Sequence, residues 1–124
     1  MYESGENYLE TILVLSKRGN SVRSIDIARE LEFSKPSVSR AVGILKEDGF
    51  ISIDEDGIIK LSEKGILKAE GVFERHQILT AFLIKTAGVS PEAAEEDACR
   101  IEHIISEDTF IGIKKYLQLN SSTL

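Results

Sequence analysis

Hydrophobic positions in the first part of the chain recur at intervals of three and four residues, which is the spacing of one face of an α-helix. Residues 7–18, 24–31 and 35–48 each carry such a stripe. Serine is a preferred residue at helix starts, so we expect Ser24 and Ser34 to cap the second and third segments. The pattern therefore predicts three helices, with a short turn between the second and the third.

The pattern changes over residues 50–62, where two short β-branched runs flank an Asp-Gly pair. Such runs around Asp-Gly are typical of a β-hairpin. Helical spacing then returns over residues 63–88, over residues 91–105, and from about residue 106 onward. The second part of the chain is therefore predicted to be a hairpin followed by three further helices.

A helix-turn-helix followed directly by a hairpin is the plan of winged-helix DNA-binding modules. The element order predicts a mainly α fold, in which residues 1–70 form a winged helix-turn-helix with a small β-hairpin wing. Residues 71–124 are expected to form a separate helical region. An unrelated small α+β domain is the alternative.

The composition is ordinary for a globular protein, with 42% hydrophobic and 29% charged residues. No apolar run approaches the roughly 18 residues that cross a bilayer. The start of the chain lacks a basic stretch followed by an apolar one, and a single cysteine cannot form an internal disulfide. We therefore expect a cytoplasmic protein with no membrane partner.

The net charge of −6 argues at first against a nucleic-acid partner. Between Lys17 and Lys46, however, seven basic side chains stand against three acidic ones, so this segment is locally +4. Binding depends on where the charge lies rather than on its total. The asymmetry favours a DNA-binding surface, and a solvated helical face is the alternative.

The third predicted helix has a face that can contact DNA. Val38, Val42 and Leu45 define its buried side, and Arg40 falls almost opposite them. The Arg40 guanidinium can donate two hydrogen bonds to a guanine in the major groove. Hydroxyls and a lysine near the helix start suit phosphate oxygens, although a serine there is more often only a helix cap. The predicted DNA-contacting residues are Ser34, Lys35, Pro36, Ser37, Ser39 and Arg40.

The stretch "DACRIEH" holds the only cysteine and one of the two histidines. On a continuous helix, Cys99, Glu102 and His103 project into one sector, where a thiolate, a carboxylate and an imidazole suit a divalent transition ion. The other histidine, His76, lies on an apolar stripe of the long helix. Cys99 as a small buried hydrophobe and His76 as a core histidine are the alternatives. The convergence of these rare residues favours a metal site.

Cysteine and histidine also permit a nucleophile and a base, with Cys99 and His103 in these roles. The sequence shows no obvious oxyanion-hole loop and no Gly-rich phosphate loop. We therefore predict that the protein is not an enzyme and has no small-molecule substrate.

Four stretches, "ENYLETIL", "SIDIARELEFSKPSVSRAVGILKEDGFI", "ERHQILTAFL" and "DACRIEHIISE", resemble the diphtheria-toxin-repressor family of iron- and manganese-dependent repressors. The chain is most similar to the short class that lacks an SH3-like domain. The resemblance implies metal ligands at Glu10, His76, Cys99, Glu102 and His103. Asn7 stands where the family usually has Asp or Met, and an amide oxygen could still coordinate. Thr80 and Glu95 replace the Glu and His of a second, iron-type site, which is therefore expected to be incomplete.

The resemblance further implies a repressor of metal-uptake genes that binds double-stranded operator DNA as a homodimer. Fe²⁺ is the first choice of corepressor because Cys99 is a soft ligand, Mn²⁺ is next, and Zn²⁺ or Co²⁺ can bind in vitro. Dimerisation is implied through the C-terminal helices, where the apolar surface is expected from Ile101, Ile104, Ile105, Phe110 and Ile113. The alternatives are a winged-helix regulator not controlled by metal, and a metal-buffering protein with no role on DNA.

Overall fold

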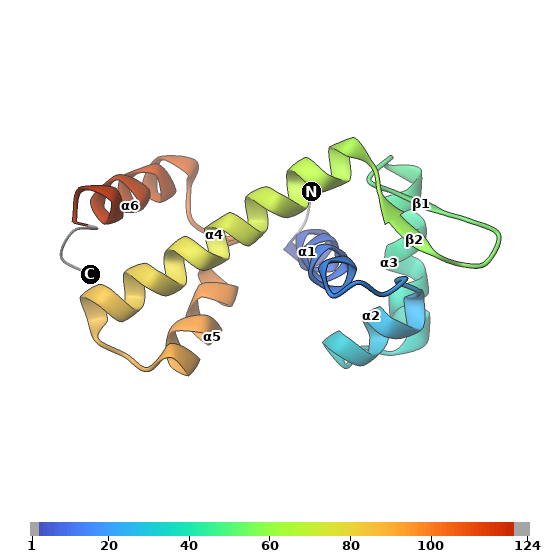
Figure 1. The fold of residues 1–124 in the computed structure, drawn as a ribbon, viewed down its shortest axis with the longest axis horizontal. Coiled ribbons are helices and arrows are strands. Elements are labelled where there is room, and N and C mark those ends of the chain that lie inside the picture. Colours follow the sequence, from blue (N-terminus) through green and yellow to red (C-terminus); the bar gives the residue numbers. More distant parts are fainter. Residues whose placement is uncertain (1–2, 121–124) are drawn as a thin grey trace. The chain divides into compact units, whose positions relative to one another are not determined.

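The computed structural model describes residues 3–120. This part of the chain forms six helices and one antiparallel hairpin (Figure 1). The elements are α1 (Glu3–Lys17), α2 (Ser24–Leu31), α3 (Lys35–Glu47), β1 (Ile51–Ile53), β2 (Ile59–Leu61), α4 (Glu63–Ala87), α5 (Pro91–Ile101) and α6 (Glu107–Leu119). The predicted mainly α fold, with a helix-turn-helix followed by a hairpin, is confirmed. None of the described helices combines the length and the apolar character that a membrane span requires.

The chain divides into two compact units, Met1–Gly71 and Val72–Leu124, so α4 contributes residues to both. The core of the N-terminal unit is built from the apolar stripes of its helices and from the inward side of the hairpin. Because these residues recur at helical spacing, each short helix can bury one face and expose the other. The buried side chains include Leu9, Ile12, Ile27, Val38, Val42, Leu45, Ile51 and Ile59.

The hairpin forms as the Asp-Gly pair predicts. Ile53 pairs with Ile59, and the Asp54 side chain accepts hydrogen bonds from the backbone N–H groups of Asp56 (2.9 Å) and Ile58 (3.0 Å). Gly57 has a φ of 80°, a left-handed conformation that glycine adopts without strain. The turn is therefore held by its own side chains and backbone.

The start of α2 differs from the prediction, because Ser24 is the first helical residue and Arg23 takes the cap position. The Ile59 N–H donates to the Val22 carbonyl (2.7 Å), which keeps the chain extended up to Arg23. The Asp26 carboxylate then accepts from the Arg23 N–H at 2.8 Å. The prediction of a Ser24 cap was wrong because an edge contact to the hairpin sets where the helix begins.

The C-terminal unit consists of the later residues of α4 together with α5 and α6. Phe82 of α4 meets Tyr116 of α6 edge to face, with ring centroids 5.9 Å apart, and Lys114 pairs with Glu74 at 2.7 Å. Ser90 caps α5 by accepting from the Ala93 N–H at 3.1 Å. The contacts of Phe82 with Tyr116 and of Glu74 with Lys114 thus hold α6 against α4.

Candidate metal centre

The helix that carries Cys99 ends earlier than its sequence pattern predicts. α5 stops at Ile101, and both the Ile104 and the Ile105 N–H groups donate to the Ile101 carbonyl, at 3.0 and 3.2 Å. The prediction of a helix through residue 105 was therefore wrong. Glu102, the C-cap of α5, keeps helical backbone angles (φ −60°, ψ −26°), and His103 lies in the turn that follows.

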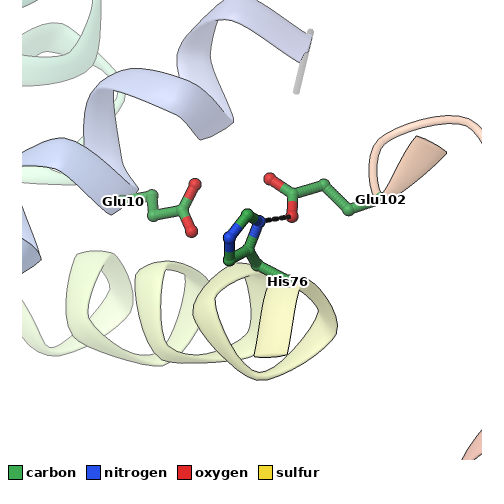
Figure 2. A group of neighbouring side chains, drawn as sticks. All are labelled: Glu10, His76 and Glu102. Carbon is green, nitrogen blue, oxygen red and sulfur yellow. Dashed lines mark hydrogen bonds and ion pairs between the residues drawn. The ribbon is translucent and has the colours of Figure 1, made fainter. Parts of the chain in front are cut away.

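Glu102 is a buried carboxylate placed between two imidazoles. Only 1% of Glu102 is exposed, and its Oε2 lies 3.0 Å from His76 Nδ1, as Figure 2 shows. Its other oxygen, Oε1, lies 3.1 Å from His103 Nε2. The structure thus brings together three of the residues predicted as ligands, all within the C-terminal unit.

The donor atoms around Glu102 fit a divalent cation. Oε1 approaches His103 without hydrogen-bond geometry and has no hydrogen-bond partner among the described residues. A buried carboxylate oxygen left in this state costs free energy, which a bound cation offsets. Two ligand atoms at right angles around an ion, each about 2.1 Å from it, are about 3 Å apart. His76 Nδ1 and Glu102 Oε2 are 3.0 Å apart, a hydrogen-bond distance that a shared ion would leave nearly unchanged.

The remaining predicted ligands belong to other elements, α1 and α5. Cys99 is exposed on α5. Asn7 and Glu10 are half-buried on α1, in the N-terminal unit, and Figure 2 draws Glu10 together with His76 and Glu102. That these three residues ligate a metal stays a prediction.

Thr80 and Glu95, which stand at two positions of the second, iron-type site, make other contacts in the structure. Thr80 donates its hydroxyl hydrogen to the His76 carbonyl at 2.7 Å, within α4. Glu95 lies with Oε1 at 3.6 Å from His76 Nε2, although its side chain is 67% exposed. A carboxylate beside the second nitrogen of a ligating histidine commonly orients the ring. No signal in the sequence marks Glu95 for such a role, because this position stands out only as a replaced ligand.

Arg75 is the second residue near the centre that the sequence analysis missed. Its guanidinium donates to the carbonyl oxygen of Glu102 at 2.7 Å. The only signal that the sequence offers is that Arg75 directly precedes His76. This signal is weak, because consecutive residues of a helix point in different directions. Three-dimensional contacts were needed to connect Arg75 with this site.

The residues predicted to contact DNA all lie on one exposed part of the N-terminal unit, at the start and along the outer side of α3. Ser34 is the cap of α3, and its Oγ accepts from the Ser37 N–H at 3.3 Å. Arg40 is exposed, while Val38 and Val42 are buried, as the helical pattern predicts. The tip of the hairpin is acidic, and its Asp56 carbonyl accepts from Arg23 Nε at 3.2 Å.

Known proteins resemble both units. Residues 1–59 match the family described as iron dependent repressor, N-terminal DNA binding domain, and residues 62–121 match iron dependent repressor, metal binding and dimerisation domain. The transcriptional regulator MntR of Escherichia coli O157:H7 is 34% identical over 113 residues, which cover 91% of this chain and 72% of that protein. The iron-dependent repressor IdeR of Mycobacterium tuberculosis is 33% identical over 117 residues, which cover 94% of this chain and 51% of that protein.

The structure of the manganese regulator SloR has a TM-score of 0.83 and 26% identity, covering 92% of this chain and 53% of that one. The chain thus spans about half the length of IdeR and of the SloR chain. The resemblance drawn from the sequence motifs is confirmed. The chain belongs to the iron-dependent repressor family, whose members are metal-dependent, DNA-binding transcriptional regulators.

Proposed function

We propose that this protein represses metal-uptake genes and uses Fe²⁺ or Mn²⁺ as its corepressor. The observation that carries the proposal is the buried Glu102 carboxylate, which lies between the imidazoles of His76 and His103. A carboxylate with two imidazoles suits a first-row transition ion better than Ca²⁺ or Mg²⁺, which prefer oxygen ligands.

The proposed ligand set contains His76, Glu102 and His103 from the C-terminal unit. We assign Cys99 to the same set, together with Glu10 and Asn7 from α1, as the family resemblance implies. Fe²⁺ is our first choice because a thiolate is a soft ligand, and Mn²⁺ follows. Zn²⁺ and Co²⁺ are expected to bind in the test tube because their intrinsic affinities for such sites are higher.

The proposed mechanism couples the ion to DNA through the two units of the chain. Ligands from α1 and from the C-terminal unit make metal binding depend on how the units are arranged, so the ion stabilises one arrangement. If that arrangement is the one that binds the operator, metal and DNA each tighten the binding of the other by the same factor. A preference of a few kcal/mol is enough to act as a switch.

The proposed DNA partner is a palindromic operator that binds a homodimer. The family match to residues 62–121 includes a dimerisation function, and the C-terminal unit exposes Ile104, Ile111, Tyr116 and Leu119. Phe110 was expected to contribute to this surface, but it is buried. Its ring lies under Arg75, with 5.0 Å from the guanidinium carbon to the ring centroid. Two-fold symmetry places two α3 helices against half-sites about one helical turn, roughly 34 Å, apart.

Removal of the metal tests the proposal directly. Operator binding by the full chain is measured by fluorescence anisotropy under anaerobic conditions, first with Fe²⁺ or Mn²⁺ and then with an excess of chelator. We expect affinity to fall at least tenfold, ~1.4 kcal/mol, when the metal is removed. Operator binding that ignores the chelator would instead favour a winged-helix regulator without metal control. Tight metal binding without any operator binding would favour a metal buffer.

Arg40→Ala is expected to weaken binding to the selected operator by about 1–3 kcal/mol and to relax the base preference at one position of each half-site. The reason is that Arg40 is exposed on the outer side of α3, where its guanidinium can reach a guanine edge. Binding is measured on the operator and on variants of each base pair. Lys35→Ala, at the exposed start of α3, is the control, because its predicted contact is to phosphate and its loss should weaken binding to all sequences about equally. Unchanged base preference in Arg40→Ala would exclude this contact.

A further inference from the structure

The turn of residues 102–106, between α5 and α6, carries two of the proposed metal ligands, Glu102 and His103. A chain that leaves a helix has carbonyl groups without helical donors, which need other partners when they are shielded from water. Arg75 of α4 supplies such donors. Its Nη1 donates to the carbonyl oxygens of Glu102 at 2.7 Å and of Ile105 at 3.4 Å.

The guanidinium of Arg75 is itself held in place. Its Nη2 donates to Glu107 Oε2 at 2.8 Å, in the first turn of α6. One face of the group lies over the ring of Phe110, which is buried. Only 20% of the Arg75 side chain is exposed. A planar group with fixed donor directions, packed in this way, can fix the position of the backbone that it binds.

Glu102 is therefore held at two points by consecutive residues of α4. Arg75 binds its main-chain carbonyl at 2.7 Å, and His76 contacts its carboxylate at 3.0 Å. Because residues 75 and 76 belong to one rigid helix, the first contact helps to set the geometry of the second. Arg75 also donates to the carbonyl of Ile105, so it binds the backbone on both sides of His103.

We infer that Arg75 is a positioning residue of the metal centre, which keeps Glu102 and His103 in place for the ion without touching it. This inference rests on the proposed function. Groups that orient metal ligands typically raise metal affinity by about 10- to 100-fold, and the loss of Arg75 is expected to have an effect of this size. Glu107, which contacts only the outer side of the guanidinium, is expected to matter far less.

The test compares three variants of the full chain. Arg75→Met keeps an unbranched apolar stem over Phe110 and removes every donor, while Arg75→Lys keeps the charge and a single donor group. Glu107→Gln leaves the bonds from Arg75 to the two carbonyls and is the control. Mn²⁺ affinity is measured by competition with a chelating dye, and the visible absorption bands of bound Co²⁺ report the ligand geometry.

We expect Arg75→Met to bind Mn²⁺ about 10- to 100-fold more weakly and to show altered Co²⁺ bands. Arg75→Lys should restore part of the affinity, and Glu107→Gln should stay within about threefold of the wild type. All titrations are made well below the unfolding temperature of the metal-free variants. If Arg75→Met is less stable yet keeps wild-type Mn²⁺ affinity and Co²⁺ bands, Arg75 is only structural and the inference is wrong.

Glu102→Gln in the same series separates this inference from the proposed function. If the wild type binds Mn²⁺ no more tightly than Glu102→Gln does, the proposed metal centre is refuted, and so is the role of Arg75. If the wild type binds Mn²⁺ more tightly than Glu102→Gln does but no more tightly than Arg75→Met does, only the role of Arg75 is refuted. Loss of affinity in both variants, with partial recovery in Arg75→Lys, supports both conclusions.

Discussion

Glu102→Gln is expected to lower the affinity for Mn²⁺ by at least about 100-fold, ~2.7 kcal/mol, and to abolish the metal response of operator binding. Glutamine fills nearly the same space as glutamate, but it lacks the negative charge and offers one oxygen instead of two. Both oxygens of Glu102 lie about 3 Å from a histidine nitrogen, so each is placed to share an ion with an imidazole.

The measurement is a Mn²⁺ titration followed by operator binding at saturating Mn²⁺. Glu96→Gln is the matched control, because it makes the same change of charge at an exposed position of α5 and should respond to metal as the wild type does. Thermal unfolding of the metal-free variants shows whether both are folded. A folded Glu102→Gln protein that still responds fully to Mn²⁺ would show that Glu102 is not a ligand.

The sequence indicates where the proposed metal-binding segment lies, but not its geometry. Cys99, Glu102 and His103 stand out as rare residues at close spacing, and the hydrophobic pattern continues through Ile104 and Ile105. This pattern predicts an unbroken helix, on which the three side chains share a face. The helix ends at residue 101 instead, and the carbonyls beyond it are bound by a side chain from α4. A contact between residues far apart in the sequence leaves no mark on local periodicity.

The N-terminal unit was easier to predict because most of its elements carry local signals. The buried stripe of α3, the Ser34 cap and the Asp-Gly hairpin each depend on residues within a few positions of one another. The exception is the start of α2, where the strand-like contact between Val22 and Ile59 sets the boundary. Local chemistry thus determines most of these elements, while a contact between distant residues sets the start of α2.

Gly65 lies where α4 comes against the entry to the hairpin, and a side chain cannot fit there. A Cβ atom at this position would be 2.0 Å from the Phe50 carbonyl oxygen and 3.3 Å from Leu61 Cδ2. The Phe50 carbonyl cannot move away easily, because it accepts from the Ser62 N–H at 2.9 Å. The Phe50 N–H in turn donates to the Leu45 carbonyl at 3.0 Å. The backbone at this contact is therefore fixed on several sides.

Gly65→Ala is expected to lower the free energy of unfolding by about 3 kcal/mol, at the upper end of the usual cost of overpacking, because backbone must move. Gly43→Ala is the control. Gly43 is an exposed residue inside α3, and a Cβ there meets no described atom within 4 Å. It should stabilise the protein by about 0.5–1 kcal/mol, since alanine favours the helix over glycine.

Urea unfolding followed by circular dichroism measures both changes, at one protein concentration because the proposed dimerisation would contribute to stability. The sequence alone predicts that alanine is better than glycine at both helical positions. The structure predicts opposite signs, because only residue 65 touches the backbone of another element. If Gly65→Ala is as stable as the wild type or more so, then α4 does not pack against Phe50 in this way. Loss of stability at residue 65, together with a gain at residue 43, would show that the close approach of these two backbones holds the hairpin against α4.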